Sequence, residues 1–265
     1  MTRSEEIKSC CAAVYSSDAV ALLLGDSYHP GGATLTRRLA TLTNLRPAQR
    51  VADIASGPGA TARLLTTEYD VLVDGVDFAT PTVQRARETS ARLGLADRIQ
   101  FHVGDAERIP LPDNSVDVVV TECAFCTFPD KEAAAAEFGR IIRPGGRIGL
   151  ADVTVAEVGL PDELSTLAAW VACVADAKPV TGYCQILNDA GLKVIHTESH
   201  DDALVRMIDQ IEARLHLVRM TQKDVVIAAG IDVDKVLNFI DTARRAVTDG
   251  LLGYALVIAE KRSHP

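Results

Sequence analysis

The stretch "VADIASGPGATA", residues 51–62, decides the fold. The mostly apolar run Val51–Ile54 predicts a buried strand, which a glycine-rich turn and then a helix follow. Gly57 and Gly59 carry no side chain, so the backbone can approach a ligand, and the helix start offers N–H groups that the helix does not use. A tight strand-to-helix turn without any ligand remains an alternative at this point.

Apolar, β-branched runs alternate with amphipathic segments over the first two thirds of the chain. This alternation predicts a parallel sheet with helices on both faces, and right-handed crossovers make such a sheet doubly wound. The predicted strands are 51–54, 71–76, 99–103, 116–120 and 147–152, and the predicted helices are 60–67, 81–93 and 132–142.

Two helical regions accompany this core in the prediction. Residues 1–45 are expected to form a helical N-terminal cap, 46–200 and 250–262 the core, and 201–249 a helical insertion before the last strand. In the insertion, apolar residues recur at three- and four-residue spacing. This stripe suits either a pocket cover or a dimer face, so a homodimer is an open expectation. The stripe consists of Leu204, Ile208, Ile211, Leu215 and Val218.

Two classes of cofactor compete for the glycine loop. Gly57, Gly59 and Ala62 satisfy the G-x-G-x-x-G/A pattern of nicotinamide dinucleotide sites. Asp77 lies 20 residues beyond Gly57, as that pattern also requires. Asp53 argues the other way, because a carboxylate at the end of the first strand would repel a pyrophosphate. It suits a ligand that carries an amino group and a sulfonium.

Later motifs agree with the sulfonium ligand. "VDGVDFA" (73–79) ends a second strand with Asp77, which is placed to accept hydrogen bonds from ribose hydroxyls, and Phe78 can pack on an adenine face. "HVGDAERIP" (102–110) places an aspartate and an alanine after a third strand, and "IIRPGGRIGLADV" (141–153) places a Pro-Gly-Gly turn before a fifth.

Together these motifs resemble the class I S-adenosylmethionine-dependent methyltransferases over about residues 46–200 and the final strand. The resemblance implies an α/β fold with a doubly wound, Rossmann-like seven-stranded sheet, and S-adenosylmethionine as cofactor. It also implies that the loop after the fourth strand faces the transferable methyl group. Ala55 stands where the family usually has a glycine. The implied cofactor-binding residues are Asp53, Ala55, Gly57, Gly59, Asp77, Phe78, Asp105, Ala106 and Thr121.

The loop after the fourth strand, "TECAFCTFPDK" (121–131), holds two cysteines three residues apart. Cys123 and Cys126 have three interpretations. They are small packing residues, ligands of a zinc ion that Cys10, Cys11 or His29 completes, or thiolates for a soft metalloid. A lone C-x-x-C is at most half of a zinc site, so the spacing alone does not decide between them.

A second resemblance concerns the branch of the family that methylates trivalent arsenic. In that branch a cysteine precedes the glycine of an "AGF"-like turn by 18 residues, as Cys173 precedes Gly191 in "DAGLKV". Cys10 or Cys11 matches the branch's N-terminal cysteine, and its cysteine beyond the sixth strand has no counterpart here. The predicted catalytic residues are Cys123, Cys126, Cys10, Cys11, Cys173 and Glu122.

Three functions follow as hypotheses. The protein is a methyltransferase acting on a thiol-bound metalloid, a methyltransferase acting on a small organic metabolite, or a non-catalytic cofactor- or zinc-binding sensor. An oxygen or nitrogen nucleophile needs a base, for which Glu122, His29 and Tyr15 are candidates.

The charge and composition of the chain restrict the classes of partner that we expect. The net charge of −9 argues against nucleic acid and against an anionic membrane surface, and it suits a small cationic ligand. No apolar run approaches the ~20 residues of a membrane helix, and the first residues do not read as a signal peptide. We expect a cytoplasmic protein whose partner is a small-molecule or metalloid acceptor and whose six cysteines are mostly reduced.

Overall fold

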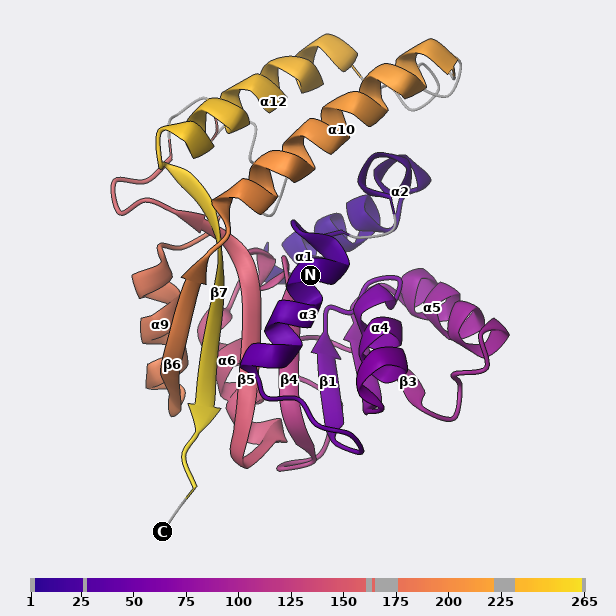
Figure 1. Ribbon diagram of the computed structural model, residues 1–265, viewed down its shortest axis with the longest axis vertical. Coiled ribbons are helices and arrows are strands. Elements are labelled where there is room, and N and C mark those ends of the chain that lie inside the picture. The colour runs from indigo at the N-terminus through magenta and orange to yellow at the C-terminus, as the bar shows by residue number, and fades with distance from the viewer. Residues whose placement is uncertain (1–2, 26–27, 161–163, 165–175, 222–231, 264–265) are drawn as a thin grey trace.

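The computed structural model describes residues 3–25, 28–160, 164, 176–221 and 232–263 (Figure 1). The strands are β1 Arg50–Ile54, β2 Leu72–Asp77, β3 Ile99–Val103, β4 Val116–Glu122, β5 Ile142–Val155, β6 Leu192–Ser199 and β7 Leu252–Lys261. The helices are α1 Arg3–Tyr15, α2 Asp18–Leu24, α3 Gly32–Leu42, α4 Ala60–Tyr69, α5 Thr80–Arg92, α6 Lys131–Ile141, α9 Val180–Asp189, α10 Asp201–Thr221 and α12 Val233–Thr248.

All the strands belong to one sheet of seven, in the order β3-β2-β1-β4-β5-β7-β6. β1 to β5 pair in parallel, whereas β7 runs antiparallel between β5 and β6. The order reverses direction at β1 and β4, so the carboxyl ends of these two strands leave a crevice in which ligands of such sheets bind. The predicted doubly wound, seven-stranded α/β sheet is confirmed.

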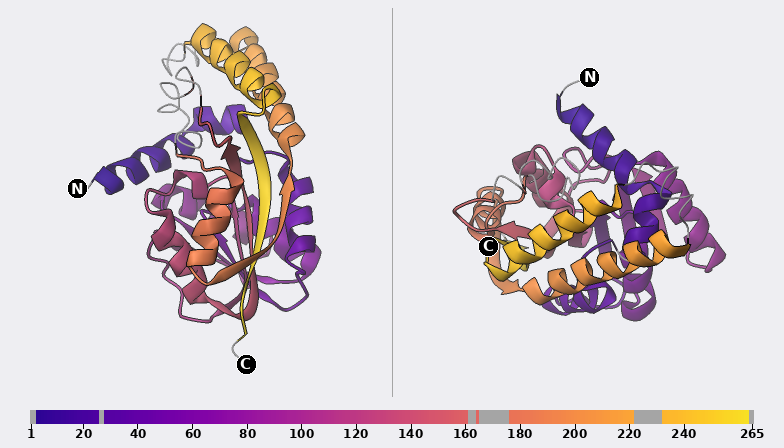
Figure 2. Two further views of the ribbon diagram at one scale, coloured as in Figure 1. Left: turned by 90° about the vertical axis from the view of Figure 1, so that its left-hand side faces the viewer. Right: turned by 90° about the horizontal axis from the view of Figure 1, so that it is seen from above.

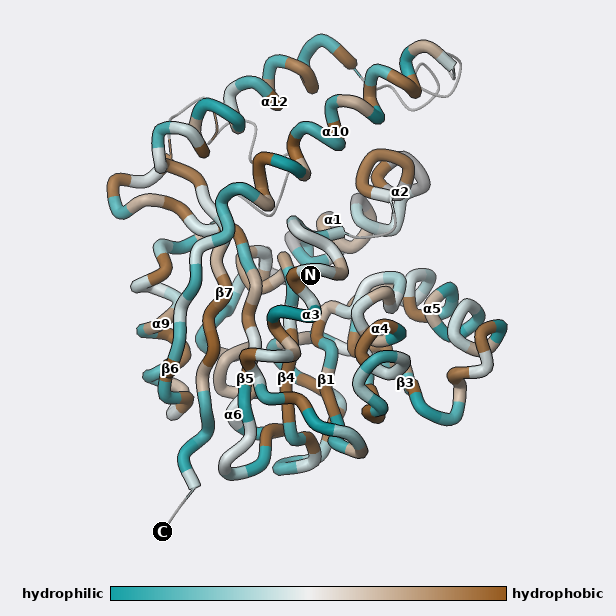
Figure 3. Tube along the Cα trace, viewed as in Figure 1, coloured by the Kyte–Doolittle hydropathy of each residue, from teal (hydrophilic) through white to brown (hydrophobic). Residues whose placement is uncertain are grey.

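The sheet separates two hydrophobic cores, and helices cover both of its faces (Figure 2). Helices α3, α4 and α5 pack on one face, and α6 and α9 pack on the other. Figure 3 shows hydrophobic residues along the central strands, while α10 and α12 alternate between hydrophobic and hydrophilic positions. A strand covered on both faces needs apolar side chains throughout, which explains the unbroken runs in the sequence.

Helices α10 and α12 lie side by side beyond the carboxyl ends of the parallel strands, and they connect β6 to β7 (Figure 1). A helical insertion before the last strand was predicted, and it is present. The buried residues of α10 include the predicted apolar stripe, with Ile211 half-buried beside the core. None of the described helices has the length and apolar character needed to span a membrane.

Local chemistry explains where the helices near the crevice begin. α4 starts after Gly59, whose φ of 80° lies in the left-handed region that glycine adopts without strain. An added Cβ at Gly59 would approach Phe101 Cζ to 2.5 Å, so glycine is also needed for space. α6 starts after Asp130, whose side chain accepts a hydrogen bond from the Ala133 N–H and caps the helix.

β5 begins earlier than the sequence predicted. Ile142 already pairs with Val116, and the pairing shifts register before Arg147 meets Val118. Gly145, within the Pro-Gly-Gly segment, has a φ of 79°. The segment therefore interrupts the register inside one long strand rather than preceding the strand as a turn.

Two fully buried tyrosines allow a matched test of core hydrogen bonding. The Tyr183 hydroxyl donates to the Val153 carbonyl (3.0 Å) and accepts from the Lys178 N–H (3.2 Å). The Tyr254 hydroxyl has no hydrogen-bond partner among the described residues.

We expect Tyr183→Phe to lower the free energy of unfolding by about 1–2 kcal/mol, because it breaks two buried hydrogen bonds. Tyr254→Phe should leave it unchanged or raise it. Urea denaturation measures both, and an equal loss in the two variants would contradict the hydrogen-bond argument.

Candidate active site

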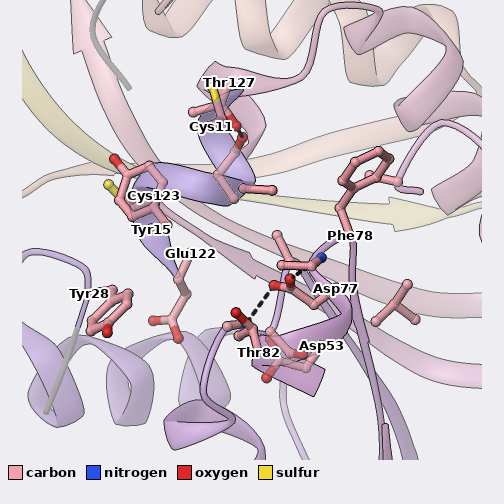
Figure 4. Close-up of a pocket in the computed structure, with 18 of the residues that line it drawn as sticks. Cys11, Tyr15, Tyr28, Asp53, Asp77, Phe78, Thr82, Glu122, Cys123 and Thr127 are labelled. Atoms are coloured by element: carbon pink, nitrogen blue, oxygen red, sulfur yellow. Dashed lines mark hydrogen bonds between the residues drawn. The ribbon is translucent and has the colours of Figure 1, made fainter. Parts of the chain in front are cut away.

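A cleft lies at the carboxyl ends of β1, β2 and β4, and the N-terminal helix α1 closes one side of it (Figure 4). Most of the predicted cofactor-binding residues line this cleft, together with two of the predicted cysteines. The lining includes Asp53, Ala55, Gly57, Asp77, Phe78, Asp105, Ala106, Glu122, Cys123 and Cys11, and also Lys8, Tyr15, Ser56, Tyr28 and His29.

The glycine loop adopts the backbone shape that its sequence predicts. Gly57 has a φ of 52° and lies open toward the cleft, with no atom that an added Cβ would contact. Ala55 also has a positive φ, 58°, at the position where the family usually has glycine. A left-handed conformation costs a residue with a Cβ about 1–2 kcal/mol, so Ala55 keeps the loop shape at the expense of local strain.

Asp53 ends β1 as a buried carboxyl group, with 3% of its surface exposed. Its Oδ2 atom has no hydrogen-bond partner among the described residues, and neither does the buried Ser56 Oγ beside it. Burial raises the pKa of Asp53 well above its usual value, and the nearby carboxylates of Glu122 and Asp77 add to this effect. Two unsatisfied polar atoms that line one cleft indicate a ligand with hydrogen-bond donors at this position.

Asp77 is fixed by the backbone around it. Its two carboxylate oxygens accept hydrogen bonds from the N–H groups of Gly57 and Ala79, each at 2.9 Å. Burial raises the pKa of Asp77 above its usual value, while the two N–H groups act in the opposite direction. The adjacent Phe78 leaves 40% of its surface exposed, although it is a large apolar residue. The pair therefore presents a fixed acceptor next to an uncovered aromatic ring.

Helix α1 is attached over the far end of the cleft. Lys8 forms an ion pair of 2.7 Å with Asp105 and a second ion pair with Glu107. Ser16 Oγ lies 2.9 Å from Thr82 Oγ1, and its carbonyl accepts a hydrogen bond from Arg85. Lys8 was not identified from the sequence, because nothing local to it indicates a partner almost a hundred residues away.

Glu122 ends β4 at the centre of a polar cluster. Its carboxylate accepts hydrogen bonds from Thr61 Oγ1 at 2.6 Å and from Thr36 Oγ1 at 3.1 Å, and His29 Nε2 lies 3.5 Å away. The Glu122 side chain is 4% exposed and the His29 side chain 9% exposed. Tyr15 and Tyr28 line the same part of the cleft (Figure 4). The arrangement offers acid–base groups shielded from bulk water.

The structure does not bring the predicted cysteines together in one place. Cys123 and Cys11 line the cleft, whereas Cys126 is fully buried in the core and is not among the cleft residues. Cys10 lies in α1, but its side chain is outside the described part, as is all of Cys173. The described residues contain no group of three His, Cys, Asp or Glu side chains placed to hold a metal ion. Thr121 is also buried, and it does not line the cleft.

Two buried charged residues hold the loop that carries Cys123. Asp152 Oδ2 accepts hydrogen bonds from the N–H groups of Ala124 (3.2 Å) and Cys126 (3.1 Å). Lys131 Nζ, 2% exposed, donates to the Cys126 carbonyl at 2.9 Å and pairs with Asp176 at 2.5 Å. These contacts explain why Cys126 turns into the core, and the sequence contained no signal for either residue.

The sheet order, the glycine turn after β1 and the acidic residues that end β1 and β2 define the class I methyltransferase fold. Residues 52–150 match a protein family described as a methyltransferase domain. A putative sarcosine dimethylglycine methyltransferase from Galdieria sulphuraria has a similar solved structure, with a TM-score of 0.78 and 20% identity. That similarity covers 88% of this chain and 86% of the other.

Two curated relatives extend the comparison. The arsenite methyltransferase of Halobacterium salinarum is 30% identical over 162 residues, which cover 60% of this chain and 41% of that protein. The 27-O-demethylrifamycin SV methyltransferase of Amycolatopsis mediterranei is 36% identical over 118 residues, covering 44% and 43%. The chain thus spans about two fifths of the length of these relatives. Residues 52–150 thus match a methyltransferase domain, and the fold is that of the class I S-adenosylmethionine-dependent enzymes, as the motifs predicted.

We expect the buried Asp53 carboxyl to make cofactor binding depend on pH. Burial raises the pKa of Asp53 well above its usual value, and an ammonium group of the ligand would pair with the ionised form. Affinity for S-adenosylhomocysteine should therefore fall as pH is lowered below neutral, and binding should release a proton from Asp53. Calorimetry in buffers of different ionisation enthalpy measures both.

Asp53→Asn should bind about tenfold more weakly at neutral pH and lose this pH dependence, since a charge-assisted hydrogen bond contributes ~1.5–3 kcal/mol. Asp70→Asn, at an exposed aspartate that follows α4, is the matched control and should bind as the wild type does. Equal pH profiles in the wild type and Asp53→Asn would assign the titration to another group.

Proposed function

We propose that this protein binds S-adenosylmethionine in the cleft and transfers the methyl group to a small organic acceptor. The residues that line the cleft fit this cofactor. The Asp53 carboxylate and the loop at Gly57 would hold the amino-acid part, Asp77 the ribose, and Phe78 and Asp105 the adenine. The cofactor supplies a methyl group on a sulfonium, which leaves as a neutral thioether.

The single observation that carries the choice of acceptor is the environment of Glu122. This carboxylate sits beside Asp53 at the end of the central strands, where the methionine part of the cofactor would end, and His29 lies 3.5 Å from it. An oxygen or nitrogen nucleophile loses a proton when it is methylated, and Glu122 is placed to accept that proton. Thr36 and Thr61 fix its orientation, so the base needs little rearrangement on binding.

The remaining contribution of the chain is alignment and exclusion of water. Tyr15 and Cys11 from α1 and Tyr28 from the segment before α3 close the cleft around the acceptor position. The ion pairs of Lys8 fix α1 to the loop after β3, so the same contact that closes the adenine end also positions Tyr15 and Cys11. Water exclusion matters because it strengthens each polar contact inside the cleft.

The test of this proposal is release of S-adenosylhomocysteine with a panel of small alcohols, phenols, amines and carboxylic acids. We expect turnover with at least one acceptor, and Glu122→Gln should lower kcat about 10²–10⁴-fold, the usual contribution of a general base. Affinity for S-adenosylhomocysteine should change little. The control is Glu132→Gln, at an exposed glutamate on α6. Cofactor binding without turnover on any acceptor would instead favour a non-catalytic binding protein.

A thiol-bound metalloid is the second candidate acceptor. Its support is that Cys11 and Cys123 line the same cleft and that the arsenite methyltransferase of Halobacterium salinarum is among the similar proteins. Trivalent arsenic is soft and binds thiolates, and it needs no general base. Cys126 is buried in the core, so two described thiols rather than three reach the cleft.

Arsenite provides the test of this second candidate. With arsenite, glutathione as thiol and reductant, and S-adenosylmethionine, a metalloid enzyme should release S-adenosylhomocysteine. In that case Cys11→Ser and Cys123→Ser should each lower the rate at least tenfold, since each removes a ligand, and Glu122→Gln should have little effect. Cys184→Ser, at a half-buried thiol on α9 that does not line the cleft, is the control. A rate that survives in the Cys11→Ser/Cys123→Ser double variant would exclude this acceptor.

A further inference from the structure

A second cavity lies on the other side of His29 from the cofactor cleft. It is formed between the start of α3, with Gly31 and Thr34, and the first two thirds of α10, with Arg206, Gln210 and Arg214. His29 lines both this cavity and the cleft, so the two adjoin at this residue. On the side of the cleft, the Glu122 carboxylate lies 3.5 Å from His29 Nε2.

The charge of this cavity is opposite to that of the protein. The chain has 36 acidic and 27 basic residues, yet two arginines and no aspartate or glutamate are among the described residues that line the cavity. Two arginines, with no acidic residue in the described part of the lining, indicate a site for negative charge in an acidic protein. The cofactor cleft has the reverse character, because Asp53, Asp77 and Glu122 all line it.

Arg214 is the strongest single feature of the cavity. It is half-buried, and its guanidinium donates to the carbonyls of Leu23 (2.9 Å) and Leu24, which fix its position. No carboxylate among the described residues pairs with it. A guanidinium has five N–H donors in a planar fork, so donors remain for a carboxylate or phosphate.

Arg206 supplies a second positive charge eight residues earlier on the same face of α10. It pairs with Asp202 at 2.5 Å, but both side chains are largely exposed, at 61% and 69%. Exposed ion pairs within a helix contribute less than ~1 kcal/mol, so Arg206 can exchange this partner for a bound anion at little expense. Leu24, Leu35 and Met207 provide an apolar wall beside the two arginines.

We propose that this second cavity is the acceptor subsite, and that it binds an oxyanion group of the acceptor, a carboxylate or phosphate, through Arg206 and Arg214. The inference rests on the proposed methyltransferase function and narrows its substrate class to small organic anions with an apolar part. The anionic end occupies the basic cavity, and the nucleophile reaches past His29 to Glu122. The cationic donor and the anionic acceptor thus bind in adjoining sites of opposite charge.

The test uses simple anions on the full chain saturated with S-adenosylhomocysteine. Inorganic phosphate and acetate are titrated separately at constant ionic strength, and the line widths of the ³¹P and acetate ¹³C resonances report binding. We expect saturable binding of at least one anion by the wild type. Arg206→Gln and Arg214→Met should each weaken it at least fivefold, and the double variant should abolish it. Arg219→Gln, at an exposed arginine further along α10, is the matched control and should bind as the wild type does.

Binding of S-adenosylhomocysteine is measured in every variant. It distinguishes a failure of the acceptor subsite from a failure of the proposed methyltransferase function. Because Arg214 also holds two carbonyls, Arg206→Gln provides a second variant that leaves those contacts intact. The acceptor subsite is overturned, even if the cofactor binds, by either of two results. One is that the wild type binds neither anion saturably, and the other is that the wild type and both variants bind an anion equally well. Failure to bind S-adenosylhomocysteine would instead overturn the proposed function.

Discussion

The site depends on one constraint, a carboxyl group buried at the end of the central strand without a full set of partners. Asp53 has an unsatisfied Oδ2 atom and two neighbouring carboxylates, Asp77 and Glu122. An unsatisfied buried polar group destabilises a fold by about 1–3 kcal/mol, and like charges nearby add to that. A ligand that brings an ammonium and a sulfonium removes both penalties. Relief of this penalty would therefore contribute to the binding energy of a cationic ligand.

A rigid support is the second requirement, because methyl transfer depends on alignment. Asp152 and Lys131 hold the loop after β4 from opposite sides, through its N–H groups and its carbonyls. In this loop Cys123 has a left-handed conformation, with a φ of 54°. Backbone strain of this kind persists where the surroundings over-determine it, which is common at functional sites. Helix α1, in contrast, is attached to the loop after β3 through the side-chain contacts of Lys8.

The sequence predicted those features that have a local cause. Strands and helices follow from apolar periodicity, and Asp53 and Asp77 were identified because each lies at the end of a predicted strand. Glu122 was identified because the family resemblance places the loop after the fourth strand beside the methyl group. Contacts between distant segments gave no local signal. Thr36 reaches Glu122 across 86 residues and Lys8 reaches Asp105 across 97. The C-x-x-C spacing suggested that Cys123 and Cys126 face one ligand, but a 3₁₀ turn and the bond to Asp152 point Cys126 into the core.

The opposite charges of the two cavities favour an order of binding in the proposed reaction, with the methyl donor before the acceptor. The acidic cleft attracts the cationic donor, and once bound, the donor offsets the charge of the cleft carboxylates and weakens the negative field that Glu122 would present to an anionic acceptor. Binding of the donor first then favours binding of the acceptor, without any conformational change. Transfer of the methyl group removes the sulfonium charge, and the proton of the nucleophile neutralises Glu122 in the same reaction. The negative field beside the acceptor site returns when Glu122 releases that proton, and this promotes release of the methylated anion.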